Sequence, residues 1–302
     1  MNGAVALTHR GVIRAHGEEA ASFLHSQLTN DFQVLGLSQA RLAAYCSAKG
    51  RMLASFVAWK AAHDEILLAC DAGVLPATLK RLSMFVLRAK CKLSDATAEV
   101  PLTGLTGATA QRHLQGLPVW GRREVDGGSV IRLPDGAGLV RALLAGRPAD
   151  ESEAIALDTW RWLEVQSGVP VIEAATVEQF VPQMLNFELL GGVNFQKGCY
   201  PGQEVVARAQ YRGTVKRRSF LFDVDAPARA GQELFARADP GQPAGIVANA
   251  APRPDGSGSS LLAEVKLAAA GAAALHLGAP DGPLLAPREM PYAVPRDADQ
   301  AA

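Results

Sequence analysis

The first third of the chain alternates between two spacings of apolar residues, one typical of helices and one typical of strands. Apolar positions three or four apart predict a short amphipathic helix over Glu18–Leu28 and a second helix over Leu75–Val86. Gly50 lies in the link between two strand-like runs and is free to take a positive φ, so we expect a hairpin there. Continuous apolar runs predict the strands Ala43–Cys46, Met52–Trp59 and Glu65–Cys70.

The rest of the chain divides into a less regular middle and a strand-rich end. In the middle we expect helices over Ala108–Gln115 and Glu151–Gln166 and a strand over Gly138–Leu144. After Arg218 short apolar runs are broken by Gly, Pro and Asp at close intervals, which is typical of a small all-β barrel or sandwich. We therefore expect a domain boundary near residue 215 and a frayed tail from Pro291.

Composition narrows the class of protein. At 302 residues, 48% hydrophobic and 20% charged, the chain is long enough for two or three globular domains. Its formal net charge is zero, so no overall field attracts it to nucleic acid or to an anionic membrane. We expect no direct membrane contact and at most indirect contact with nucleic acid.

The cysteines argue against a metal site formed by neighbouring residues. Cysteines occur at positions 46, 70, 91 and 199, with no CxxC pair, so the sequence predicts no zinc or iron–sulfur ligand set. Their low density argues against a secreted disulfide scaffold, and the N-terminal segment lacks the apolar run of a signal peptide. We expect a cytoplasmic protein, with Cys70 and Cys91 in the core because their neighbours are apolar.

One run of eight residues, Lys197–Glu204, combines a thiol, two charges, two glycines and a proline. Lys197 precedes Cys199 by two residues, and nearby cations favour the thiolate, which is the form that acts as nucleophile and metal ligand. The proline suits the first turn of a helix, so we expect Cys199 just before a helix N-terminus, where free N–H groups also stabilise negative charge. The alternative is a surface loop with an incidental cysteine. We favour a functional thiol, with Cys199 and Lys197 as the reactive pair.

This run resembles the signature of the YgfZ family, which are folate-binding proteins linked to iron–sulfur cluster maintenance and tRNA modification. The resemblance extends from near the N-terminus to about residue 218, with a weaker match in the expected barrel. The matching segments lie within Phe23–Asp31, Lys49–Arg51, Trp162–Ile172, Phe180–Asn186 and Gly191–Phe195.

The family shares its fold with the T-protein of the glycine cleavage system, an aminomethyltransferase. The resemblance therefore implies an α+β protein with three domains around a central cavity that holds tetrahydrofolate or a derivative, and with a C-terminal β-barrel. A discontinuous first α+β domain is expected over residues 1–35 and 100–214, with a second α+β domain inserted over 36–99. Residues 215–302 would form the small barrel and the tail.

The resemblance also implies which side chains contact the folate. A folate has a flat ring body and an anionic tail, so its site needs an apolar slot, a few hydrogen-bonding groups and cations at the mouth. Core packing explains the aromatic candidates equally well, and a solvated surface explains the cationic ones. The candidate contacts are Gln183, Asn186, Phe187, Tyr200, Gln203, Glu204, Arg208, Lys49 and Arg51.

Two places depart from the transferases of this fold. Those enzymes carry an acidic residue shortly after the equivalent glycine turn, where a carboxylate can move protons to and from an aminomethyl adduct. The aligned positions here are Ala54 and Ser55. The transferases also tend to have an arginine in the helix where this chain has Glu164. Aminomethyl transfer is therefore disfavoured, and we do not expect a classical enzyme.

Our first hypothesis is a tetrahydrofolate-binding accessory protein that supports assembly or repair of iron–sulfur clusters in client enzymes, including tRNA-modifying ones. Cys199 would be its essential thiol; because one cysteine cannot hold a cluster alone, it would act between protein, folate and client. The second hypothesis is a folate-dependent one-carbon transferase. The third is a thiol redox or RNA-docking module that binds no folate.

Overall fold

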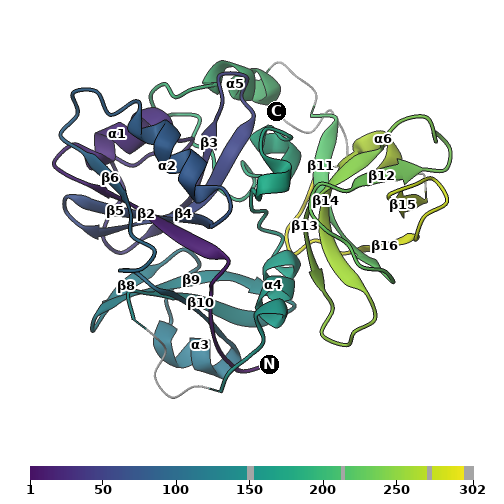
Figure 1. The fold of residues 1–302 in the computed structure, drawn as a ribbon, viewed down its shortest axis with the longest axis horizontal. Helices are drawn as coiled ribbons and strands as arrows, with labels where there is room; N and C mark the ends of the chain where they lie inside the picture. The colour runs from purple at the N-terminus through teal and green to yellow at the C-terminus, as the bar shows by residue number, and fades with distance from the viewer. Residues whose placement is uncertain (148–152, 212–214, 271–273, 296–302) are drawn as a thin grey trace.

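Three antiparallel sheets organise the chain, of which the computed structural model describes residues 1–147, 153–211, 215–270 and 274–295 (Figure 1). The first sheet has the order β1-β7-β10-β9-β8. Side chains alternate across it: Leu144 faces helix α3 (Gly107–Leu114), whereas its neighbour Leu143 faces the second sheet. The strands are β1 (Gly3–Ala6), β7 (Leu102–Thr106), β8 (Arg122–Val125), β9 (Gly128–Gly136) and β10 (Leu139–Ala145).

The second sheet has the order β3-β4-β5-β2-β6 and carries helices α1 (Ala20–Gln27) and α2 (Leu75–Ser83) on one face. Phe56 and Ala58 of β4 pack under these helices, and Trp59 on the opposite face packs toward the first sheet. One layer of the hydrophobic core therefore lies on each side of the second sheet. The strands are β2 (Arg10–His16), β3 (Ala40–Cys46), β4 (Met52–Ala62), β5 (Glu65–Asp71) and β6 (Lys92–Asp95).

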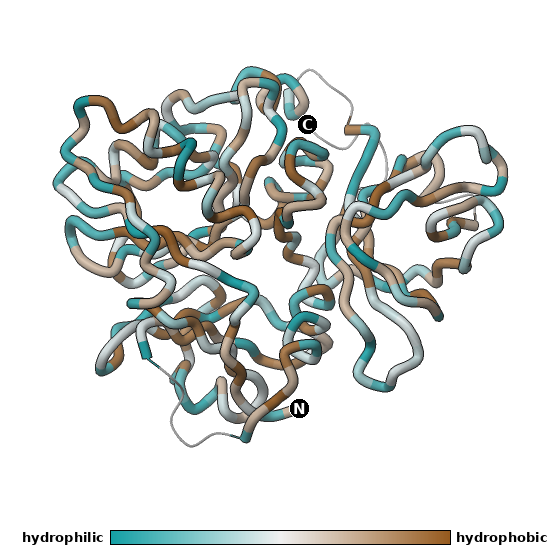
Figure 2. The backbone as a smooth tube through the Cα atoms, in the orientation of Figure 1, coloured by the Kyte–Doolittle hydropathy of each residue, from teal (hydrophilic) through white to brown (hydrophobic). Residues whose placement is uncertain are grey.

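The third sheet is C-terminal and nearly closes into a six-stranded barrel, in the order β15-β12-β13-β14-β11-β16. A bridge between His276 and Leu284 brings its two edges together. In Figure 2 the strands carry much of the hydrophobic colour and many outer turns are hydrophilic. The strands are β11 (Arg217–Val224), β12 (Glu233–Ala236), β13 (Gly245–Pro252), β14 (Ser259–Lys266), β15 (Leu275–Leu277) and β16 (Leu285–Arg288), with the short helix α6 (Leu267–Ala270) after β14.

Helix α4 (Leu157–Gln166) lies between the two-sheet body and the barrel (Figure 1). Trp162 Nε1 donates to Ser260 Oγ at 3.0 Å and so ties the helix to the barrel. Between α4 and β11 the described residues form the 3-10 turns η1 (Ala174–Thr176) and η2 (Pro182–Leu185) and helix α5 (Gln203–Tyr211). Within the described residues, no helix has the length and apolar character needed to span a membrane.

The predicted elements are largely confirmed, with differences at their ends. The helix expected over Glu151–Gln166 begins only at Leu157, because the residues before it are extended. Ala154 forms a bridge with Ala4 of β1, and Ile155 donates its N–H to the carbonyl of Ala4. The start of that prediction, residues 151–152, lies outside the described residues. The helix expected to reach Val86 ends at Ser83.

The strand pairing does not follow the expected domain boundary at residue 35. Strand β2 pairs with β5, so residues 10–16 belong to the same sheet as β3–β5 although the first domain was expected to include them. The expected tail is tied down at Tyr292, whose hydroxyl donates to the carbonyl of Gly168 at 2.8 Å. Its last part, residues 296–302, lies outside the described residues.

Candidate functional site

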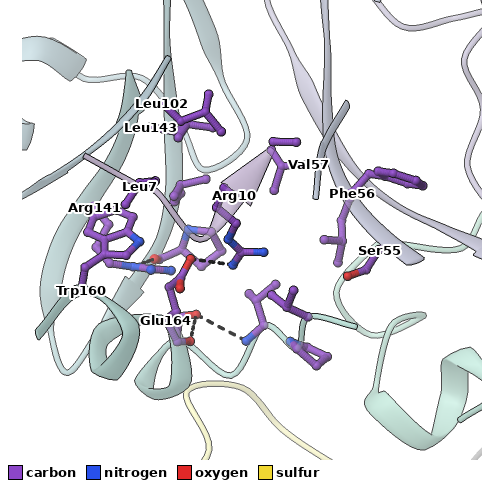
Figure 3. A pocket seen from close by; sticks show the side chains of 18 of the residues that line it. Leu7, Arg10, Ser55, Phe56, Val57, Leu102, Arg141, Leu143, Trp160 and Glu164 are labelled. Atoms are coloured by element: carbon purple, nitrogen blue, oxygen red, sulfur yellow. Dashed lines mark hydrogen bonds and ion pairs between the residues drawn. The ribbon is translucent and has the colours of Figure 1, made fainter. Parts of the chain in front are cut away.

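A central cavity lies between the two N-terminal sheets and α4, where the inner faces of three elements meet (Figure 3). Its volume is about 60 Å³, which is room for a few water molecules. Most of its wall is apolar, and the polar side chains come from β2, β4, β10, α4 and Ser167 just after α4. The lining residues include Leu7, Arg10, Ser55, Phe56, Val57, Leu102, Leu133, Arg141, Leu143, Trp160, Glu164, Val169 and Val171.

Glu164 is the negative centre of one wall. Its Oε1 accepts from Arg10 Nη2 at 2.6 Å, and its Oε2 lies 3.0 Å from His9 Nε2. Burial opposes ionisation, yet the Arg10 guanidinium and His9 hold the pKa of the Glu164 carboxyl well below its usual range. The wall therefore keeps a fixed carboxylate at neutral pH.

Arg141 lies in the same wall and is incompletely bonded. It is 3% exposed, its Nε donates to the carbonyl of Pro134 at 3.0 Å, and its guanidinium carbon lies 5.1 Å from the Trp160 ring centroid. Burial lowers the pKa of Arg141 to about 10, which leaves the group charged at neutral pH. Among the described residues, neither Arg141 Nη1 nor Trp160 Nε1 has a hydrogen-bond partner. The cavity therefore offers two buried donors without acceptors.

The three residues that depart from the transferase pattern lie at this cavity or beside it. Glu164 and Ser55 line it, on different sides in Figure 3, and Ala54 is buried in the core under α1 and α2. Ser55 Oγ accepts the backbone N–H of Ile172 at 2.9 Å, so it supports the segment after α4. Neither position 54 nor position 55 supplies a carboxylate to the cavity.

The signature run lies elsewhere, between α1 and α5. Cys199 is exposed, and α5 begins four residues later at Gln203, so the thiol precedes a helix as expected. The other three thiols are buried or half-buried, and desolvation raises their pKa values: to about 12 for Cys46 and Cys70 and to about 11 for Cys91. Cys199 is therefore the thiol that a partner in solution can reach.

Lys197 is buried and acts as an anchor for the run. Its Nζ donates to the backbone carbonyls of His25 and Leu28, the second at 2.9 Å, and so satisfies carbonyls at the end of α1. The same ammonium lies 4.7 Å from the Tyr200 ring centroid. Burial lowers the pKa of Lys197 to about 8, with Asp31 and Cys199 opposing that change. Its bonds fit a positioning residue better than a group that contacts substrate.

Three predicted folate contacts lie in the core. Gln183 Nε2 donates to the carbonyl of Val206 at 2.8 Å, and Asn186 Nδ2 donates to that of Ser219 at 2.8 Å. Phe187 is fully buried in the cluster that joins β3 to the segment before α5. These bonds hold η2, α5 and β11 together. Folate contact by the three residues stays a prediction, and Tyr200, 6% exposed, is buried beside Lys197.

The remaining candidates gather at one end of the molecule. Gly50 packs against Val205 in α5, so the hairpin tip with Lys49 and Arg51 lies beside the start of that helix. Arg51 donates to the carbonyl of Gln179. Lys49 is exposed at the tip, as are Glu204 and Arg208 on α5, whereas Gln203 is half-buried.

Of the described residues predicted as folate contacts, none lines the central cavity; the cavity groups that sequence reasoning missed are Arg10 and Arg141. One signal in the sequence could have pointed to Arg141: it is a charged residue within the otherwise apolar strand Leu139–Ala145. No group of three or more His, Cys, Asp or Glu that could hold a metal occurs in the part of the chain that the structure describes.

Comparisons with known proteins agree with the fold and with the family resemblance. No family model matches the chain. It is 31% identical over 246 residues to the tRNA-modifying protein YgfZ of Sodalis glossinidius, covering 76% of this chain and 74% of that one. It is 32% identical to the protein of the same name from Colwellia psychrerythraea, covering 72% and 71%. The aminomethyltransferase T of the glycine cleavage system from Bartonella henselae has the same fold, with a TM-score of 0.72 at 16% identity over 96% of this chain and 86% of that one.

Proposed function

This chain belongs to the family of tRNA-modifying YgfZ proteins, and from that premise we propose that it binds tetrahydrofolate in its central cavity and serves tRNA modification as an accessory protein. The predicted resemblance and the predicted aminomethyltransferase-like α+β fold are confirmed. The ligand and the accessory role are the proposal.

The observation that carries the proposal is the pair of unpaired buried donors, Arg141 Nη1 and Trp160 Nε1, in an otherwise apolar cavity. A buried donor without an acceptor costs free energy, and a buried guanidinium costs more. A ligand that combines a flat apolar ring with oxygen acceptors would remove that cost. Tetrahydrofolate has this chemistry.

Calorimetric titration with tetrahydrofolate tests the proposal. We expect saturable binding by the native chain and weaker binding, by about tenfold or more, for Arg141→Met, since a hydrogen bond to a charged group is lost. Arg122→Met is the matched control, because Arg122 is also buried in a strand of the first sheet but bonds to Ser129 and Leu37 outside the cavity. Absence of heat and of any thermal shift with the native chain would contradict folate binding and favour a thiol or RNA-docking module.

We further propose that Cys199 acts on iron–sulfur client proteins at the surface. The support is that Cys199 is the exposed thiol of the chain and that its run shares no residue with the cavity lining. A client would supply the remaining cluster ligands, since one thiolate cannot hold a cluster. We expect Cys199→Ser to fail, and Cys91→Ser to succeed, in restoring client-enzyme activity to a deletion strain. Restoration by both variants would contradict the role of the thiol.

A one-carbon transferase remains the alternative because the aminomethyltransferase T fold is shared. The hydroxyl of Ser55 is a weak proton carrier compared with a carboxylate, and it already accepts a backbone N–H. Turnover of an aminomethyl donor by the purified chain with tetrahydrofolate would establish the alternative.

A further inference from the structure

The loop that joins α2 to β6 presents three large apolar side chains to solvent at the outer side of the second sheet (Figure 1). Met84 is 66% exposed and Leu87 is 84% exposed, and Phe85 between them is exposed as well. Single apolar side chains on a surface are ordinary, but three within four successive positions form a patch of the kind that marks an interaction site. We call Met84, Phe85 and Leu87 the apolar loop patch.

The loop that carries this patch is fixed to the body of the protein. Val86, Ala89 and Cys91 pack against the hydrophobic cluster beneath α1 and α2. The N–H of Lys90 donates to Glu19 Oε2 at 2.6 Å, and the carbonyl of Lys90 accepts the N–H of Glu19 at 3.2 Å. The apolar loop patch is therefore held in a defined arrangement, which lowers the entropic cost of binding a partner.

Cations surround the apolar loop patch. Residues 72–94 contain no Asp or Glu, although the chain as a whole has a formal net charge of zero. Lys90 pairs with Glu18 at 2.9 Å, but within the described residues no ion pair is found for the other exposed cations of this segment. Those cations are Lys80, Arg81, Arg88 and Lys92. The surface therefore combines apolar contact area with a local positive charge.

We propose that this surface binds an acidic segment of a partner protein, in which carboxylates lie beside apolar side chains. The apolar side chains of the partner pack on Met84 and Leu87, and its carboxylates face Lys80 and Arg88. The apolar anchors supply most of the affinity, whereas the cations select the partner and speed its association. The inference uses neither the central cavity nor Cys199, so it goes beyond the proposed folate and thiol functions and does not depend on them.

Other occupants fit this surface less well. Surfaces that bind single-stranded RNA stack bases on several aromatic side chains, and Phe85 is the one aromatic residue within residues 72–94. An interfacial helix lays a long apolar face on a bilayer, but α2 turns its apolar face into the core through Leu75, Leu79 and Leu82. A second copy of the chain would place like charges against one another in a symmetric contact.

Fluorescence anisotropy with a defined probe tests the inference. The probe is a fluorescein-labelled helical peptide of about four turns with Glu on one face and Leu on the other, and a matched probe has Lys at every Glu position. We expect the native chain to bind the Glu probe about tenfold tighter than the Lys probe or more. We also expect binding of the Glu probe to weaken as sodium chloride rises from about 50 to about 300 mM, because exposed charges are screened.

Two double variants separate the apolar and the charged contributions. Met84→Ser with Leu87→Ser should weaken the Glu probe by about tenfold, and Lys80→Glu with Arg88→Glu should abolish or reverse the preference for the Glu probe. Leu284→Ser is the matched control, because Leu284 is also a large exposed apolar residue but lies just before β16 in the barrel, and it should bind as the native chain does. The substituted side chains are exposed, so all variants should keep the native melting temperature.

Equal affinity of the native chain for the Glu and Lys probes would overturn the inference, as would unchanged binding of the Glu probe by the Met84→Ser, Leu87→Ser variant. Labelled tRNA and vesicles of anionic phospholipid are titrated in the same way. If either binds the native chain and loses affinity in that variant while the Glu probe does not, the surface belongs to nucleic acid or lipid and the inference is wrong. Titration with tetrahydrofolate and complementation by Cys199 variants report on other parts of the molecule, so failure here leaves the proposed function intact.

Discussion

Lys197 gives the sharpest test of how the signature run is held, because its charge is buried. Its side chain is anchored to two carbonyls at the end of α1 and packs on Tyr200, and the residue is 8% exposed. We expect the stability of the protein to depend on the protonation of this one lysine. The perturbations are pH and the substitutions Lys197→Met, which removes the titration with little loss of length, and Lys197→Arg, which keeps the charge.

The direction of the pH dependence follows from the pKa values of Lys197 in the folded and unfolded chains. Lysine has its ordinary pKa of 10.5 in the unfolded chain, and burial lowers the pKa of Lys197 to about 8 in the folded protein. Between these values the unfolded chain binds more protons, so the free energy of unfolding rises as pH increases from about 8 toward 10.5. One pKa unit corresponds to about 1.4 kcal/mol, so the full contribution is at most about 3 kcal/mol and the rise between pH 7 and 10 is about 2 to 3 kcal/mol.

Urea unfolding at several pH values between 7 and 10 measures this contribution. The other titrating groups are present in all three proteins, so the difference between native chain and variant isolates Lys197. We expect that difference to grow with pH by about 2 kcal/mol against Lys197→Met and equally against Lys197→Arg, since arginine does not titrate in this range. Parallel curves would refute the argument, because they would mean that the ammonium is effectively solvated.

Three other outcomes follow from the burial and packing of individual side chains. Iodoacetamide at neutral pH should label one thiol rapidly, and mass spectrometry should place it at Cys199; rapid labelling of a second thiol would contradict the burial of the others. Gly202→Ala should lower the free energy of unfolding by about 1 to 3 kcal/mol, because φ is +79° and a Cβ would lie 2.3 Å from the carbonyl oxygen of Ser47; an unchanged urea midpoint would count against that packing. Glu188→Gln should lower the free energy of unfolding by about 3 to 5 kcal/mol, since it leaves the buried Arg218 without a counter-charge and with the carbonyl of Gln183 as an acceptor; an unchanged melting temperature would contradict this.

Much of the fold could be predicted from the sequence because its elements are local runs of apolar residues. The β3–β4 hairpin and α1 were expected near their observed positions, and the strands β3, β4 and β11 are buried along most of their length, as continuous apolar runs indicate. Pairing between distant segments carries no comparable local signal. The pairing of β2 with β5 depends on the packing of the whole sheet. The sequence near residue 35 therefore gave no sign that residues 10–16 join the same sheet as β3–β5.

The thiol run is visible in the sequence, whereas the residues of the cavity wall are brought together only by the fold. Lys197–Glu204 is contiguous, so its unusual composition is visible in the sequence itself. The cavity wall instead combines Arg10 from β2, Arg141 from β10 and Glu164 from α4, which only the fold brings together. Polar residues such as Gln183 were predicted as ligand contacts; the amide of Gln183 bonds to the backbone in the core, and its contact with folate stays a prediction.

The side chains at and beside the cavity favour ligand binding over one-carbon transfer. Where transferases of this fold place a carboxylate for proton movement, this chain has Ala54 in the core and Ser55 bonded to the backbone of Ile172. The carboxylate of the cavity is on α4 instead, where Glu164 is fixed by Arg10 and His9 and its lowered pKa keeps it from exchanging a proton near neutral pH. A carboxylate that stays ionised near neutral pH is a poor general acid for a one-carbon transfer. The cavity wall therefore supports the proposed role in binding over the transferase alternative.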